Sequence, residues 1–126
     1  MEPIQLFELA SRQAQWLTVR QNVVAGNIAN ANTPHYKAKD VQPFERVLQN
    51  TGFHLAATHR AHFTESPEAA HVTEVSALDD IAVQQSGNTV AIEQEMMKTG
   101  EIKRDHELNA GLVKAFHRMM LMTVRR

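Results

Sequence analysis

The stretch between Pro3 and Pro34 contains no proline, and its regular apolar spacing is the feature that most restricts how this chain can fold. The residues that recur there in alternating steps of three and four are Phe7, Ala10, Ala14, Leu17, Gln21, Val24, Ile28 and Ala31. All but the glutamine are apolar, and this spacing predicts one long helix with a coiled-coil-like seam. Because a proline disfavours helical geometry in the residue before it, we expect the helix to end at about Ala31 or Asn32.

A second apolar stripe lies on the same predicted helix. Leu9, Trp16 and Val23 recur every seven residues, roughly 120° around the helix from the first seam. One partner helix cannot cover both faces. A three- or four-helix bundle would bury both inside the chain, but the rest of the sequence offers one other long helical segment. The sequence therefore favours burial of Leu9, Trp16 and Val23 by other subunits.

The other long helix is predicted from about Thr89 to near the C-terminus, with Asn88 or Thr89 as its N-cap. Its middle is polar apart from Ile102. Its end carries a wide apolar face, with one seam of Leu108, Leu112, Ala115, Met119 and Met122 that Val113, Phe116 and Met120 broaden. A terminal helix with so wide an apolar face needs a partner. We expect Leu112, Phe116, Met119 and Met120 to contact other subunits, although an ordinary core helix would show the same pattern.

The segment between the helices has weaker signals. Residues 41–50 can form a short helix with Phe44, Val47 and Leu48 facing inward, and GFHLAAT and AHVTEV alternate enough for a small β-hairpin. The predicted fold is therefore mainly all-α and forms a single assembly domain. Its two terminal helices, 1–32 and 89–126, pack as an antiparallel coiled-coil-like pair, joined by an irregular segment over 33–88.

Length, charge and cysteine content exclude several classes of protein. The 126 residues fit one domain, and a formal net charge of −1 argues against binding to nucleic acid. The chain has no cysteine, so disulfides and thiolate metal sites are excluded. No apolar run approaches the roughly 18 residues of a membrane span, and we see no cleavable secretory signal.

Residues with catalytic or metal-binding chemistry are sparse. His59 and His62 stand three apart near Glu65, a spacing that could bring two imidazoles to one zinc ion if the segment were helical. No further ligand-bearing element is marked, and solvated or hydrogen-bonded histidines explain the pattern as well. No glycine-rich phosphate loop or G-x-S-x-G motif is present. We expect no enzyme activity, no cofactor and no metal site.

The predicted end of the first helix is rich in asparagine, a poor helix former. Asn27 and Asn30 lie one turn apart, and neither is on the main apolar seam. Each side-chain amide has two donors and two acceptor lone pairs, so it can hold the returning chain or a neighbour's backbone. A solvated polar helix end with a proline stop is the simpler explanation for a single Asn-Thr-Pro.

The full string NIANANTPHYKAKDV is more specific, and it resembles the N-terminal signature of the flagellar basal-body rod and hook family. The matching residues are Asn27, Ile28, Ala29, Asn30, Asn32, Thr33, Pro34, Tyr36 and Lys37. His35 stands where that family usually has glycine, so a positive φ there would carry a steric cost.

A second block, GNTVAIEQEMMK, is similar to the corresponding block of the same family. Its matching residues are Gly87, Asn88, Val90, Glu95 and Met96. Ala91 replaces the acidic residue usual there. Thr58 and His62 match a T-x-x-x-H element of the short rod proteins. The distal rod and hook members of this family insert a large β-rich domain between their two terminal helices. This chain has no room for such a domain, so it is most similar to the proximal-rod members of the FlgB type.

This resemblance implies a non-enzymatic subunit of the bacterial flagellar basal-body rod. Such a protein would leave the cytoplasm through the flagellar type III export apparatus and polymerise in the periplasm with itself and other rod proteins. It would contact the membrane ring or a rod adaptor at the proximal end and transmit torque. Two other interpretations are a self-contained helical-bundle adaptor or chaperone and, less favoured, a small His-ligated metalloprotein.

Overall fold

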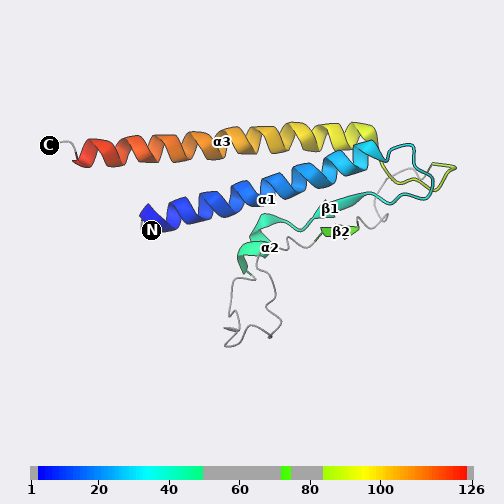
Figure 1. Cartoon of the computed structure of the whole chain (residues 1–126), viewed down its shortest axis with the longest axis horizontal. Coiled ribbons are helices and arrows are strands. Elements are labelled where there is room, and N and C mark those ends of the chain that lie inside the picture. Colours follow the sequence, from blue (N-terminus) through cyan, green and yellow to red (C-terminus); the bar gives the residue numbers. More distant parts are fainter. Residues whose placement is uncertain (1–2, 50–71, 75–83, 125–126) are drawn as a thin grey trace, which may run out of the picture.

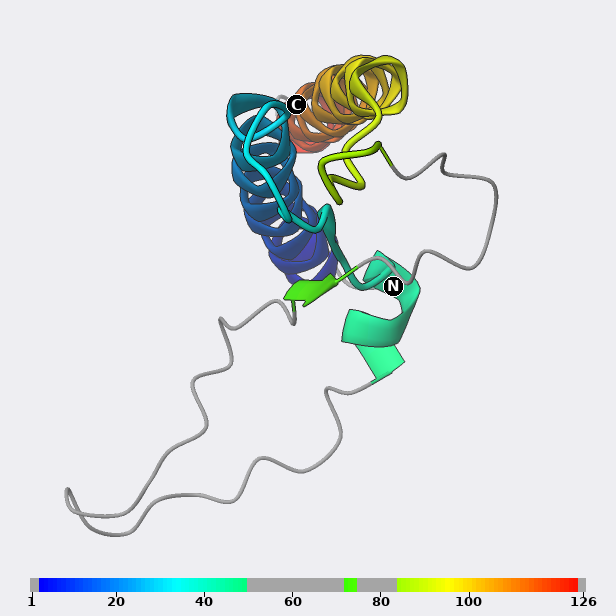
Figure 2. The ribbon, with the colours of Figure 1, turned by 90° about the vertical axis from the view of Figure 1, so that its right-hand side faces the viewer.

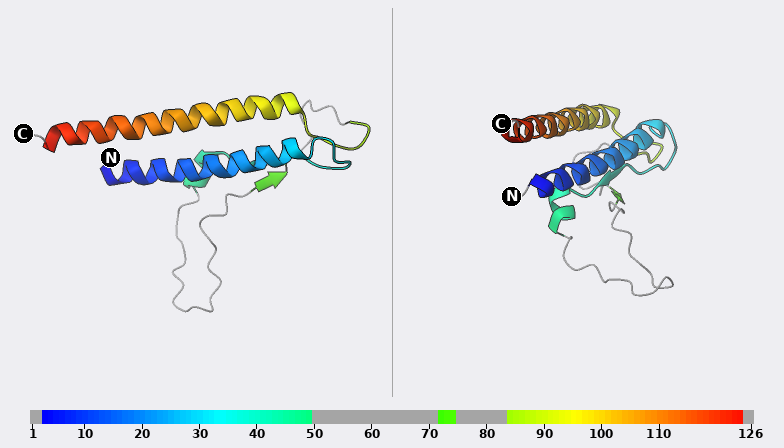
Figure 3. Two further views of the ribbon diagram at one scale, coloured as in Figure 1. Left: turned by 45° about the horizontal axis from the view of Figure 1, so that its top comes forward. Right: turned by 60° about the vertical axis from the view of Figure 1, so that its left-hand side comes forward.

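The computed structural model describes residues 3–49, 72–74 and 84–124. Two long helices, α1 (Pro3–Ala29) and α3 (Ile92–Val124), lie side by side and run in opposite directions (Figures 1 and 3). This arrangement confirms the predicted mainly helical fold built on an antiparallel pair. Both helices are slightly shorter than expected, because α1 ends at Ala29 and α3 begins at Ile92.

The polypeptide leaves α1 through tight turns, without a positive φ at Asn32. The Ala31 N–H donates to the Ile28 carbonyl at 3.2 Å, and the Thr33 N–H donates to the Asn30 carbonyl at 3.0 Å. These shorter hydrogen-bonded steps occupy carbonyls at and just beyond the end of α1, ahead of Pro34.

The helix pair encloses a small apolar core. Leu17, Val24 and Ile102 are buried together, with Trp16 and Ile28 packed against them. Toward the N-terminal end of α1, the Phe7 and Phe116 rings meet edge to face with their centroids 5.6 Å apart. The predicted seam of α1 is thus largely confirmed. Gln21 is exposed, as suits its polarity.

The seam by which α3 faces α1 differs from the one expected. Glu95, Ile102, Asn109 and Phe116 recur every seven residues, and all four contact α1 or its buried core. The Asn109 amide donates to the Ala10 carbonyl at 2.9 Å. The seam of Leu108, Leu112, Ala115, Met119 and Met122 lies instead on an exposed face of the helix.

The connecting segment forms an arm that runs along α1, below the helix pair in the views of Figures 1 and 2. It contains strand β1 (Lys39–Val41), helix α2 (Phe44–Gln49) and strand β2 (Val72–Glu74). The strands pair antiparallel, with Asp40 opposite Thr73. The expected β-structure in AHVTEV is therefore present, but its partner is 39–41. The GFHLAAT segment lies outside the described residues.

Helix α2 confirms the short helix predicted here, with Phe44, Val47 and Leu48 half-buried. The Phe44 ring packs on Trp16 at a centroid distance of 5.8 Å, and the Trp16 indole N–H donates to the Gln42 carbonyl at 2.8 Å. The arm therefore covers the middle of the second α1 stripe, so Trp16 has a partner within its own chain. Sequence reasoning missed this because the pattern of the short helix predicts an inward face but does not say which residues that face contacts.

Within the part of the chain that the structure describes, no helix is both long and apolar enough to cross a membrane.

Candidate assembly interface

The two sequence motifs meet where α1 ends and α3 begins, and Asn27 is at the centre of this junction. Its side chain is fully buried. The amide nitrogen donates to the Lys39 carbonyl at 2.6 Å and to the Glu95 carboxylate at 3.1 Å. The amide oxygen accepts from the Lys39 N–H at 3.0 Å and from the Tyr36 hydroxyl at 3.4 Å. One asparagine thus ties α1 to the arm and to α3, which explains its place in a helix.

Asn88 makes the second set of cross-links. Neither Asn88 nor Thr89, the two predicted N-caps, directly precedes α3, which begins at Ile92. Its buried amide nitrogen lies 2.8–2.9 Å from the carbonyl oxygens of Asn30, Ala31 and Thr33. Its oxygen accepts from the Val90 N–H at 2.7 Å. Asn88 therefore satisfies carbonyls at the end of α1, although it is far from them in the sequence.

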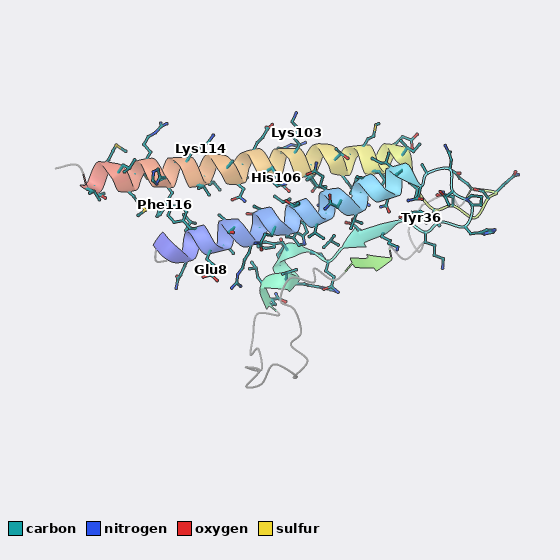
Figure 4. The ribbon with its side chains drawn as sticks, in the orientation of Figure 1. Glu8, Tyr36, Lys103, His106, Lys114 and Phe116 are labelled. Carbon is teal, nitrogen blue, oxygen red and sulfur yellow. The ribbon has the colours of Figure 1, made fainter. Side chains whose placement is uncertain are left out.

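The segment before α3 runs beside the start of the arm. The Thr89 N–H donates to the Tyr36 carbonyl at 3.1 Å, and the Ala38 N–H donates to the Thr89 hydroxyl at 2.9 Å. Ala31, Ala38 and Val90 are buried together beneath Tyr36. These contacts close the junction around a second small apolar cluster, at the end of the molecule where Figure 4 labels Tyr36.

Charged side chains surround the junction in a network centred on Asp40. The Asp40 carboxylate lies 3.3 Å from both the Arg20 guanidinium and the Lys98 ammonium group. Lys98 also lies 3.0 Å from Glu95, whose carboxylate is almost fully buried. Arg20 stacks over the Trp16 ring at 5.5 Å. The network joins β1 to both long helices, and a buried carboxylate such as Glu95 requires partners of this kind.

His35 departs from the family pattern at a position where the backbone is left-handed, with a φ of 60°. Its N–H donates to the Ser86 carbonyl at 3.0 Å. A Cβ added at Gly87, which also has a positive φ, would lie 2.8 Å from the His35 ring nitrogen Nδ1. In this conformation the His35 ring packs against Gly87, and a side chain at position 87 would have to displace it.

We expect His35→Gly to raise the free energy of unfolding by about 1 kcal/mol. A left-handed conformation costs a side-chain-bearing residue roughly 1–2 kcal/mol, and the greater freedom of glycine in the unfolded chain offsets part of that gain. Urea unfolding followed by circular dichroism measures the change. Asn32→Gly is the matched control: Asn32 is exposed in the same turn without a positive φ, so glycine there should lower stability.

Ala91 occupies the N-cap position of α3. It directly precedes Ile92, and its carbonyl accepts the helical hydrogen bond from the Glu95 N–H at 3.1 Å. Alanine has no side-chain oxygen for the free N–H groups of the first turn. We expect Ala91→Asp to stabilise the chain by about 1 kcal/mol in thermal or urea unfolding, whereas Ala91→Leu should give no gain. A destabilised aspartate variant would contradict this assignment.

The junction does not gather all motif residues. Asn27, Asn30, Tyr36, Gly87, Asn88, Val90 and Glu95 lie in it, and Asn30 holds the Gly26 carbonyl at 2.8 Å. Ile28 instead packs against the helix-pair core. The exposed motif residues are Ala29, Asn32, Thr33, Pro34, Lys37 and Met96. Sequence reasoning missed Arg20, Asp40 and Lys98, because nothing in their local pattern indicated a long-range partner, and it gave Thr89 the role of an N-cap.

The residues expected at subunit contacts divide into two groups. Trp16 packs on the arm and Phe116 on Phe7, while Leu9 and Val23 are half-buried. Leu112, Met119 and Met120 are exposed, with 58%, 52% and 36% of their surface accessible.

The exposed apolar seam of α3 is a row of side chains that the described structure leaves uncovered. We call Leu108, Leu112, Ala115, Met119 and Met122 the outer stripe; it lies about 100° around α3 from the seam that faces α1. The last turns of α3 also extend beyond the start of α1 (Figures 1 and 3). Rows of large apolar side chains left in solvent indicate a contact surface.

No group of three or more metal-ligating side chains comes together in residues 3–49, 72–74 or 84–124. His59, His62 and Glu65, the candidate zinc ligands, lie outside the described residues.

Comparisons with known proteins agree with the motif resemblance. Residues 10–37 match the sequence profile of the family described as flagella basal body rod protein. The whole chain aligns with 97% of the flagellar basal body rod protein FlgB of Agrobacterium fabrum at 60% identity. FlgB of Bacillus subtilis is 34% identical over 66% of this chain and 64% of its own length. FlgB of Aeromonas hydrophila is 37% identical over 60% of this chain and 59% of its own length.

Proposed function

The chain belongs to the FlgB family of flagellar basal body rod proteins and is a structural subunit of the bacterial flagellar basal-body rod, and from this premise we propose how it works. It acts without catalysis, by packing the outer stripe of α3 against neighbouring subunits. A stiff helix pair then carries torque from one subunit to the next.

The observation that supports this proposal is the placement of the outer stripe. Leu108 and Met122 at its two ends are 62% and 63% exposed, although another face of the same helix packs closely against α1. A self-contained bundle would turn such a stripe inward. A contact between unlike surfaces of identical or related subunits builds an open helical assembly, which is what a rod requires.

The junction has a different task in this proposal. Asn27, Asn88 and the Asp40 network hold α1, α3 and the arm as one body. A subunit that transmits torque must not hinge between its helices, and buried hydrogen bonds with few alternatives oppose hinging. The half-buried Leu9 and Val23 would add contacts along α1.

The partners that we propose are copies of this chain, other rod proteins, and the membrane ring or a rod adaptor at the proximal end. The chain would reach the periplasm from the cytoplasm through the flagellar type III export apparatus. Regions outside the helix pair would supply part of these contacts.

Deletion of the gene in its own bacterium tests the proposal. We expect basal bodies without a completed rod, loss of swimming, and recovery of both when the unaltered gene is returned. Mass spectrometry of purified basal bodies should detect the chain in the complemented strain. Complete rods and normal swimming in the deletion strain would contradict the proposal.

A further inference from the structure

The C-terminal half of α3 carries positive charge and no negative charge. After Glu107 the sequence contains no aspartate or glutamate, whereas Lys114, Arg118, Arg125 and Arg126 are basic. Lys114 and Arg118 are exposed. This half of the helix therefore differs from the first half, which contains both acidic and basic residues. Its positive charge would be complemented by an anionic partner.

The basic residues lie beside the outer stripe. At 100° per residue, Lys114 and Arg118 are about 40° apart, on the flank of the outer stripe that faces away from α1. Figure 4 shows Lys114 pointing away from α1 and Phe116 pointing toward it. Around the helix, the order is thus the α1 seam, the outer stripe and then the cations, which we call the basic flank.

The apolar and basic rows are open to a large flat partner. Leu112 and Met119 in the middle of the outer stripe are more than half exposed, and the end of α3 passes beyond α1. Both rows run parallel to the helix axis. An apolar stripe bordered by a row of cations is the pattern of helices that lie in the plane of an anionic membrane surface.

We propose that the free chain, before it joins a rod, binds anionic phospholipid surfaces through the outer stripe and the basic flank of α3. Leucine and methionine side chains enter the headgroup boundary, while Lys114 and Arg118 contact lipid phosphates. Straight parallel rows fit a plane better than the curved groove of an acidic protein. The same stripe serves subunit contacts in the rod, so membrane binding and assembly exclude each other.

Co-sedimentation of the purified full chain with vesicles tests this inference. We expect binding to vesicles of mixed phosphatidylcholine and phosphatidylglycerol, and much weaker binding to phosphatidylcholine alone. The double variant Lys114→Gln and Arg118→Gln should bind the mixed vesicles about 30-fold more weakly, from about 1 kcal/mol for each basic residue near the surface. Arg12→Gln with Lys37→Gln removes the same charge elsewhere and should bind as the unaltered chain does.

Several results would overturn the inference. Equal binding to neutral and mixed vesicles would remove the role of charge, and full binding by the Lys114 and Arg118 variant would do the same. A chain that self-associates and ignores vesicles would assign the outer stripe to a second copy. Binding to polyglutamate but not to vesicles would assign the basic flank to an acidic protein. Circular dichroism confirms that each variant keeps its helices.

Discussion

Asn27→Leu is expected to lower the free energy of unfolding by about 3–5 kcal/mol, a large part of the stability of a small domain. Leucine has a similar volume but can neither donate nor accept a hydrogen bond. The substitution leaves the Lys39 N–H and carbonyl without their partner and removes a donor from the buried Glu95 carboxylate. Buried polar groups without partners are penalised more than the loss of an exposed hydrogen bond.

Asn30→Ala is the matched control in the same asparagine-rich stretch. Asn30 is half-buried, and its side chain bonds locally to the Gly26 carbonyl and the Thr33 hydroxyl. We expect this variant to lose only about 1 kcal/mol. Urea unfolding of both variants makes the comparison. Equal losses at the two positions would show that the junction at Asn27 is not the main source of stability.

Asp substitutions in the outer stripe are expected to abolish rod assembly and leave the fold intact. In the double variant Leu112→Asp and Met119→Asp, both carboxylates stand on a face that is open to solvent in the free chain. Their charge therefore has little effect until a neighbouring subunit covers it. Burying an unpaired charge costs several kcal/mol, which is enough to prevent a contact made of modest apolar patches.

Swimming in soft agar and electron microscopy of basal bodies measure the outcome, and circular dichroism checks the helices. Ala110→Asp provides the control, since Ala110 is exposed on α3 about 200° around the helix from Leu108, well away from the outer stripe. That variant should swim. If the outer-stripe variant swims equally well, subunit contacts must be made elsewhere, and the assignment of this face fails.

In the proposed assembly, the junction fixes the helix pair and the outer stripe makes the subunit contacts. Leu17, Val24 and Ile102 join the helices, and Asn27 and Asn88 fix where they end relative to each other. Because these polar contacts are buried, they specify one arrangement of the helix pair, whereas apolar packing alone would tolerate a shift by a turn. In the proposed assembly, the outer stripe would then stand at a defined angle to the next subunit.

Local patterns in the sequence were enough to predict the two long helices, the short α2 and the main seam of α1. Each of these rests on local periodicity and on proline, and local patterns are readable without knowing the partner. The motif strings also pointed to the family without any coordinates. The arm strand β1 was missed because three residues with mixed polarity carry no strand signal.

The face of α3 that meets α1 could not be predicted without the packing of the two helices. The more apolar row, through Leu112 and Met119, was expected to be a buried seam, yet the row that contacts α1 contains Glu95 and Asn109. Those polar groups can be buried because Asn27 and the Ala10 carbonyl, both distant in sequence, satisfy them. Hydrophobicity along one helix predicts that a face needs cover, but the donors and acceptors that permit burial come from the other helix.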